Sequence, residues 1–241
     1  MSVNRKNSLN VRRMVMIAMF TAMAYVIMLV IHIKVGFLTM DVKDAVIALC
    51  GLYFGPLAAL LIAVIVPLLE LATSDTGFYG LIMNMLGSVS FSLTVSLFYK
   101  WKKTMWGAIA GLASGVAVLV AVMMLANLFV TPYYMGTTME AVRGMIPTLL
   151  LPFNLLKGIL NAGAVLLLYK PLSRALRKAG AIGTIRTDVA PKNDENSPRS
   201  GTKSASNIRS IVVTVSAIVL IVAAMVLIFA VLGGKFTFGL S

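Results

Sequence analysis

Long apolar stretches separated by short polar connections dominate this chain, and they decide what it can fold into. A helix needs about 20 predominantly apolar residues to cross the hydrocarbon core of a bilayer. Charged residues make up 12% of the chain, where a soluble domain carries roughly 25%. The sequence therefore predicts an all-α membrane protein. We expect seven spans, at residues 14–31, 42–54, 57–72, 79–98, 106–130, 146–168 and 211–232.

The positive charge is distributed in a way that predicts orientation in the membrane. Four basic residues precede the first span, three follow the fourth, and nine lie between residues 170 and 209, together sixteen of the 21 Lys and Arg. With seven spans, all three clusters fall on one side, which the positive-inside rule identifies as cytoplasmic. We therefore expect a multi-pass protein of the cell membrane with a cytoplasmic N-terminus. A nucleic-acid partner is not expected, because neither a soluble fold nor interleaved aromatic residues accompany the charge.

The composition divides the chain into four regions. Residues 180–207 are rich in Ser, Asn, Asp, Lys, Gly and Pro, a composition that buries too little apolar surface to fold. Within the apolar part, Gly55-Pro56 predicts a tight turn, Thr131-Pro132 predicts the end of the fifth span, and Pro152 predicts a kink or a delayed start of the sixth. The expected regions are a six-helix membrane domain (1–178), a flexible polar linker (179–209), an additional transmembrane helix (210–233) and a short tail (234–241).

The residues that enzymes and metal sites need are missing from the sequence. The chain contains no phosphate loop of the form G-x-x-x-x-G-K-[ST], no H-E-x-x-H, one cysteine and one histidine. His32 lies at the expected membrane edge, where a solvated histidine is a better interpretation than a catalytic one. We expect no enzymatic activity, no metal and no cofactor. If the chain drives transport, a partner or an ion gradient supplies the energy.

Three polar residues on one expected helix face form the best candidate for a binding site. Asn154, Lys157 and Asn161 are spaced i, i+3 and i+7, so they share a face of the sixth span. Polar groups within a span are costly in lipid and are therefore functional candidates. Lys157 must snorkel to the membrane surface, pair with an acid or bind a ligand. Asn154 alone would also suit helix–helix contact.

Other polar residues within or beside spans are weaker candidates. Asn84 and Asn127 lie in apolar stretches and are expected to face the protein interior. Asp44 begins the second span, where a helix N-terminus favours a carboxylate. Tyr133 is most simply an interfacial aromatic residue, with ligand stacking as the alternative. The same two interpretations apply to Tyr134.

Three further residues leave their roles open at this stage. Asp41 suits a helix N-cap as well as a ligand contact. Lys43 is expected to be solvated. Glu70 ends the third span, where it either pairs with Lys157 or faces water.

Several motifs, taken in order, resemble the S components of energy-coupling factor (ECF) vitamin importers, and specifically the riboflavin-binding members. The resemblance covers about residues 10–178, and its last two motifs are the more specific. The motifs are Phe37-Leu-Thr-Met-Asp-Val-Lys-Asp44, Gly51-Leu-Tyr-Phe-Gly-Pro-Leu-Ala58, Gly80-Leu-Ile-Met-Asn84, Asn127 through Pro132-Tyr-Tyr-Met135, and Leu151-Pro-Phe-Asn-Leu-Leu-Lys-Gly158.

The resemblance implies a six-helix bundle with a vitamin pocket near its extracellular face, covered by a lid at residues 32–40. It implies riboflavin as the transported ligand, held at the flavin ring by Asn154 and Lys157, with Asn84, Asn127 or Asp44 at the ribityl hydroxyls. It also implies a membrane T component and two cytoplasmic ATPases as partners. Ala18 and Ala22, which alone would indicate close helix packing, match the alanine pattern that S components present to the T component. The linker and seventh span lie outside the family's pattern.

Three functions remain open on the sequence. The first is a riboflavin-capturing S component, with an S component for another vitamin as its variant. The second is a stand-alone secondary transporter or channel, which would need a coupling carboxylate deep in a span; Glu70 is the candidate. The third is a structural membrane protein, which would leave the face formed by Asn154, Lys157 and Asn161 without a purpose.

Overall fold

The computed structural model describes residues 3–74, 76–178 and 237–238, and these are mostly helical. The linker and seventh span predicted at 179–233 lie outside the described residues. The helices are α1 (Val3–Val30), α2 (Lys43–Phe54), α3 (Pro56–Glu70), α4 (Gly77–Trp101), α5 (Met105–Met135), α6 (Met139–Met145) and α7 (Leu151–Lys178), with a π-helical turn η1 (Ile146–Leu150) before α7. The strands are β1 (His32–Val35), β2 (Leu38–Asp41) and β3 (Thr237–Phe238).

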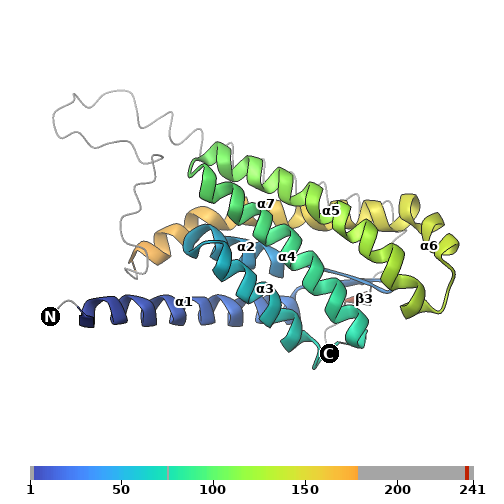
Figure 1. Ribbon diagram of the computed structural model, residues 1–241, viewed down its shortest axis with the longest axis horizontal. Helices are drawn as coiled ribbons and strands as arrows, with labels where there is room; N and C mark the ends of the chain where they lie inside the picture. Colours follow the sequence, from blue (N-terminus) through green and yellow to red (C-terminus); the bar gives the residue numbers. More distant parts are fainter. Residues whose placement is uncertain (1–2, 75, 179–236, 239–241) are drawn as a thin grey trace.

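The long helices lie side by side and give the molecule two distinct ends (Figure 1). At one end are the β-hairpin, α6 and the start of α4. At the other are the connection from α4 to α5 and the C-terminal end of α7, with the N-terminal part of α1 extending past them. The short helices α2 and α3 lie within this bundle and pack against α1 and α4.

Four helices in the described part of the chain are long and apolar enough to cross a membrane. They cover Val11–Val30, Gly77–Trp101, Met105–Met135 and Met139–Lys178. The helices at the expected second and third spans are shorter than the roughly 20 residues that a bilayer-crossing helix needs. α2 has 12 residues and α3 has 15. At 1.5 Å per residue, α2 is only about 18 Å long. A multi-pass helical membrane protein is confirmed, whereas a bundle of six full-length spans is not.

The core is apolar but holds a buried polar layer close to the hairpin. Phe20, Phe91, Ile47 and Ile62 are among the largest side chains that are completely buried. Lys43 belongs to the same group although it carries a charge. Many of the other large apolar side chains on the long helices are exposed, as expected of a surface that faces lipid.

The segment in which the resemblance implies a lid, residues 32–40, lies in an antiparallel β-hairpin. β1 pairs with β2 in a register that places His32 opposite Asp41 and Val35 opposite Leu38. β3 adds a third strand on the free side of β1, with Lys34 opposite Thr237. The hairpin is therefore an element of defined structure, and a short C-terminal segment pairs with it.

One boundary differs from that predicted at a proline. The fifth span does not end at Thr131-Pro132: α5 continues through Pro132 to Met135 and is followed by Gly136, whose φ of 62° suits a glycine after a helix. The Thr131 hydroxyl there donates to Asn127 Oδ1 at 2.9 Å. Residues 139–145 form the helix α6, which enters α7 through the π-helical turn that contains Pro147.

Candidate functional site

A cavity beneath the β-hairpin gathers four of the polar residues that the sequence singles out. Its volume is about 80 Å³, and it lies between the hairpin, α4, α5 and α7. Asn84 comes from α4, Asn127 from α5, and Asn154 and Lys157 from the first two turns of α7. Phe37, Leu38 and Thr39 of the hairpin also line it, so the hairpin covers the cavity as a lid would.

Lys157 is the charged residue of this cavity, and it pairs with an acid as the sequence allowed. Its Nζ lies 3.1 Å from Asp41 Oδ2 and donates to the carbonyl oxygen of Thr39 at 3.4 Å. Its side chain is 10% exposed, whereas that of Asp41 is completely buried. Burial alone would raise the pKa of the Asp41 carboxyl, but the Lys157 and Lys43 ammonium groups outweigh it and hold the pKa below its usual range. Lys157 therefore joins the lid strand β2 to α7.

A second ion pair behind the cavity fixes Glu70. Contrary to expectation, Lys43 is not solvated: it is completely buried, and its Nζ binds Glu70 Oε2 at 2.5 Å and lies 3.5 Å from Asp41 Oδ2. Glu70 neither pairs with Lys157 nor faces water, because its other oxygen accepts from Asn84 Nδ2 at 2.9 Å. A buried charge is stable only when paired in this way, so the network holds Asn84 at the cavity wall.

The two cavity asparagines on α5 and α7 are each anchored to their own helix. Asn127 Nδ2 donates to the carbonyl oxygen of Met123 at 2.7 Å, and Asn154 Nδ2 donates to that of Leu150 at 2.8 Å. Each amide group offers two N–H donors and a carbonyl acceptor. One donor of each is used within the helix, so both side chains present further polar atoms at fixed positions on the cavity wall.

Three of the predicted site residues lie outside the cavity. Asp44 is buried and accepts from the Ser88 hydroxyl at 2.5 Å. Asn161 is buried one layer below: its Oδ1 accepts from the backbone N–H of Ala45 at 2.8 Å, and its Nδ2 donates to the carbonyl oxygen of Asp41. It joins α7 to the start of α2. Tyr133 is 78% exposed and is not among the residues that line the cavity.

The cavity also has an aromatic wall that the sequence only partly suggests. Tyr134, and not its neighbour Tyr133, lines the cavity. The Tyr134 ring packs between Phe37 of the lid and Tyr79 of α4, at centroid distances of 6.4 and 6.1 Å. Tyr79 was not among the predicted residues; its sole sequence signal is its place next to the Gly80–Asn84 motif. The site therefore combines amide groups, one ammonium group and aromatic rings, as small-molecule pockets usually do.

The face of α1 that carries Ala18 and Ala22 is exposed, whereas Phe20 and Ala24 face the core. Two alanines at i and i+4 leave a smooth strip on the outside of the bundle. The two residues are thus available for contact with another helix.

A comparison with protein families decides what kind of protein carries this site. The family model described as the substrate-specific component of ECF transporters matches residues 12–169. The chain belongs to this family. Substrate-specific components, or S components, are transport subunits and not enzymes, which agrees with the absence of catalytic motifs from the sequence.

Individual relatives support the same assignment. The riboflavin transporter RibU of Staphylococcus aureus (strain TCH60) is 29% identical over 188 residues, which cover 73% of this chain and 100% of that protein. A solved structure of the S component of a bacterial ECF transporter has a TM-score of 0.61 and 30% identity, covering 70% of this chain and 99% of the other. Both relatives are matched almost completely, whereas more than a quarter of this S component lies outside the match.

Proposed function

We propose that this chain is the riboflavin-binding S component of an ECF importer and that the cavity beneath the hairpin is its vitamin site. The proposal rests on one observation: in a chain of this family, a single cavity is lined by Asn84, Asn127, Asn154 and Lys157. The name of the Staphylococcus aureus relative supports riboflavin as the substrate.

The chemistry of the cavity suits riboflavin. The imide edge of the flavin ring has two carbonyl acceptors and one N–H donor. The Lys157 ammonium group donates to a carbonyl, and the Asn154 amide pairs with a donor and an acceptor together. Tyr79, Tyr134 and Phe37 provide the flat apolar surfaces that a tricyclic ring needs. Asn84 and Asn127 are left for the ribityl hydroxyls.

Binding requires the site to open further. The cavity of about 80 Å³ is smaller than the roughly 300–1,000 Å³ of ordinary small-molecule sites. Of the elements that enclose it, the hairpin is the part most easily displaced, because its strands have four residues each, whereas α4, α5 and α7 are long helices. We propose that the hairpin moves outward as riboflavin enters and closes over it afterwards.

The remaining parts of the transporter are expected to be supplied by partners. A T component would contact the exposed alanine face of α1, and two cytoplasmic ATPases would hydrolyse ATP. The basic end of the molecule, which includes Lys100, Lys102 and Lys103, would face the cytoplasm together with the N-terminus. The lid and its cavity would then face the outside, where the vitamin is captured.

Reconstitution tests this proposal. Proteoliposomes that contain this chain with its T component and ATPases should accumulate riboflavin when ATP is enclosed on the cytoplasmic side. A catalytically inactive ATPase variant is the matched control and should abolish uptake. Uptake by this chain alone along a proton or sodium gradient would contradict the proposal and would favour a secondary transporter.

A further inference from the structure

A second and larger cavity lies at the opposite end of the molecule from the lid. Its volume is about 430 Å³, and it is enclosed by α1, the turn between α2 and α3, and the C-terminal ends of α4 and α7. Its position follows from helix length. The chain turns at Gly55, whose φ is 94°, whereas α1 and α7 continue past that turn (Figure 1). The short α2–α3 pair thus leaves a hollow between longer neighbours.

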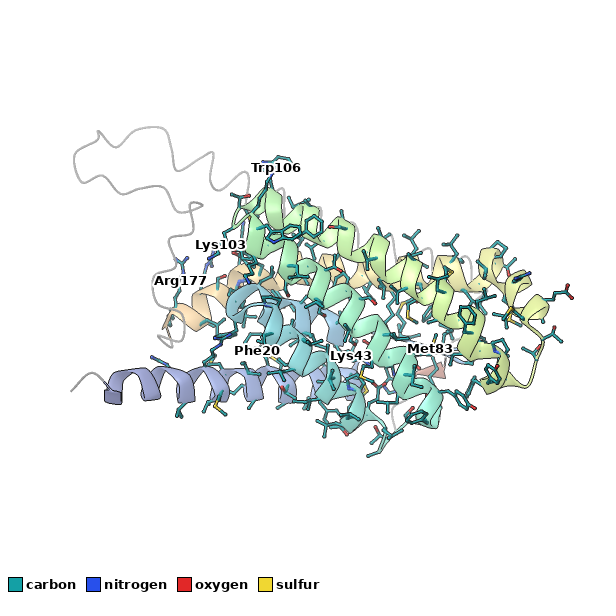
Figure 2. All side chains as sticks on the ribbon, in the orientation of Figure 1. Phe20, Lys43, Met83, Lys103, Trp106 and Arg177 are labelled. Carbon is teal, nitrogen blue, oxygen red and sulfur yellow. The ribbon has the colours of Figure 1, made fainter. Side chains whose placement is uncertain are left out.

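The cavity is strongly basic. Arg13, Lys100, Lys103 and Arg177 line it, and no carboxylate is among the lining residues that the structure describes. Figure 2 shows Lys103 and Arg177 at the same end of the bundle. Arg13 is held there by a hydrogen bond from its Nη2 to the carbonyl oxygen of Phe54, at 2.6 Å. An anion bound among these positive charges would be attracted to each of them.

The inner wall of the cavity carries hydroxyl groups in fixed positions. Tyr53 Oη donates to the carbonyl oxygen of Tyr169 at 2.8 Å and lies 2.7 Å from Ser173 Oγ. Tyr99 Oη lies 3.3 Å from Tyr169 Oη. The rings of Tyr53 and Tyr169 stack at a centroid distance of 5.8 Å. Each hydroxyl has one proton, and that of Tyr53 is used within the wall, so one hydroxyl of the Tyr99–Tyr169 pair is left to donate to a phosphate oxygen together with the cations.

The positive-inside rule accounts for basic residues at this end but requires no hollow between them. The apolar side of the cavity adds a second indication. Leu52, Phe54 and Leu57 also line it, and Leu57 is 64% exposed on the outer surface of the bundle. At the same end, Trp101 and Trp106 are 74% and 80% exposed, as aromatic residues at the membrane surface often are.

We propose that this cavity binds the headgroup of an anionic phospholipid. The phosphate lies among Arg13, Lys100, Lys103 and Arg177, with the tyrosine hydroxyls behind it, and the acyl chains pass Leu57 into the bilayer. A soluble phosphate compound would make the same contacts with the basic residues but would leave the exposed apolar side of the cavity uncontacted. The lipid would fasten α1 and α7 to the α2–α3 turn at the end away from the vitamin.

Two charge-matched double variants test the site. Lys100→Gln/Lys103→Gln removes two lining cations, and Lys102→Gln/Lys178→Gln removes two nearby exposed cations that do not line the cavity. The full-length proteins are purified in mild detergent with phosphatidylglycerol or with phosphatidylcholine of the same acyl chains. Native mass spectrometry then gives the lipid-bound fraction, and a riboflavin titration of each variant reports on the fold and on the vitamin site independently.

The expected result is selective binding of phosphatidylglycerol by the wild type and by the control double variant. The cavity double variant should bind it roughly thirtyfold more weakly, since each of the two basic residues contributes about 1 kcal/mol near an anionic lipid. Equal losses in both double variants would overturn the site. Displacement of the lipid by excess inorganic phosphate would overturn the lipid assignment in favour of a soluble phosphate compound. Unchanged riboflavin affinity throughout keeps this test separate from that of the vitamin site.

Discussion

Replacement of Lys157 by methionine tests whether this lysine binds the vitamin or only holds the lid. In the structure its ammonium group pairs with Asp41 at 3.1 Å and donates to the carbonyl oxygen of Thr39, and the proposed function adds a flavin carbonyl. A hydrogen bond from a charged group contributes about 1.5–3 kcal/mol. Its loss should therefore weaken riboflavin binding roughly ten- to a hundredfold, because 1.4 kcal/mol corresponds to a factor of ten.

The same change also affects stability, and the size of that effect follows from the contacts of Asp41. Breaking a buried ion pair costs about 3–5 kcal/mol when the remaining charge is left unpaired. Asp41 keeps two contacts with Lys43, one to the ammonium group at 3.5 Å and one to the backbone N–H at 3.2 Å. We therefore expect a loss at the lower end, about 3 kcal/mol, which a thermal unfolding curve in detergent would detect.

A double variant separates the two roles. Lys157→Met combined with Asp41→Asn removes both charges of the pair, so no uncompensated carboxylate remains, and stability should recover. Fluorescence quenching measures riboflavin affinity for the wild type, both single variants and the double variant. Weak binding by the stable double variant would show that Lys157 meets the vitamin. A double variant that binds riboflavin like the wild type would refute this role and leave Lys157 as a structural link.

Three further predictions concern other parts of the molecule. Asn154→Ala should weaken riboflavin binding by about 1–2 kcal/mol with a nearly unchanged unfolding temperature. Asn161→Ala should instead lower the unfolding temperature, because it leaves the buried N–H of Ala45 without its acceptor. The reverse pattern in parallel titration and melting experiments would contradict this division. Ala18→Trp/Ala22→Trp should leave binding intact and abolish ATP-driven uptake, and normal uptake would exclude this face as the T-component contact. Removal of residues 180–241 should leave riboflavin affinity unchanged, since the described residues that line the cavity all precede residue 158. A lost site in the truncated protein would show that the C-terminal region, whose residues 237 and 238 pair with the hairpin, is part of it.

Much of this architecture follows from simple sequence rules. Apolar stretches of bilayer length predict the long helices, and Gly55-Pro56 predicts the turn between α2 and α3. The spacing of Asn154 and Lys157 places both on one helix face, and the structure brings both to the same cavity. These features depend on local pattern, which a single sequence contains.

The rotation of each helix about its axis was harder to predict. A helix that is apolar all round has no distinct polar face from which its orientation can be read. Adjacent residues on a helix point about 100° apart, so Tyr134 faces the cavity while Tyr133 is exposed. Asn161 shares the face of Asn154 but lies deeper, where it bonds to the start of α2. That partner is more than a hundred residues away in the sequence.

The pairing of buried charges was predicted least well. Lys43 lies between two aspartates near an expected membrane edge, a setting typical of a solvated residue. Its partner Glu70 is 27 residues away, at the far end of α3. The lengths of α2 and α3 bring the two together, and the benefit of pairing charges in a low-dielectric interior then decides the contact. Neither the helix lengths nor this benefit is visible in the residues next to Lys43.

Riboflavin binding by the purified full-length protein is tested by a visible absorbance spectrum and then by a titration in which the quenching of riboflavin fluorescence is measured. We expect saturable, tight binding with one riboflavin per chain, and flavin absorbance bands if the vitamin is purified with the protein. A colourless protein that leaves riboflavin fluorescence unchanged would contradict riboflavin as the substrate, and the S component would then serve another vitamin.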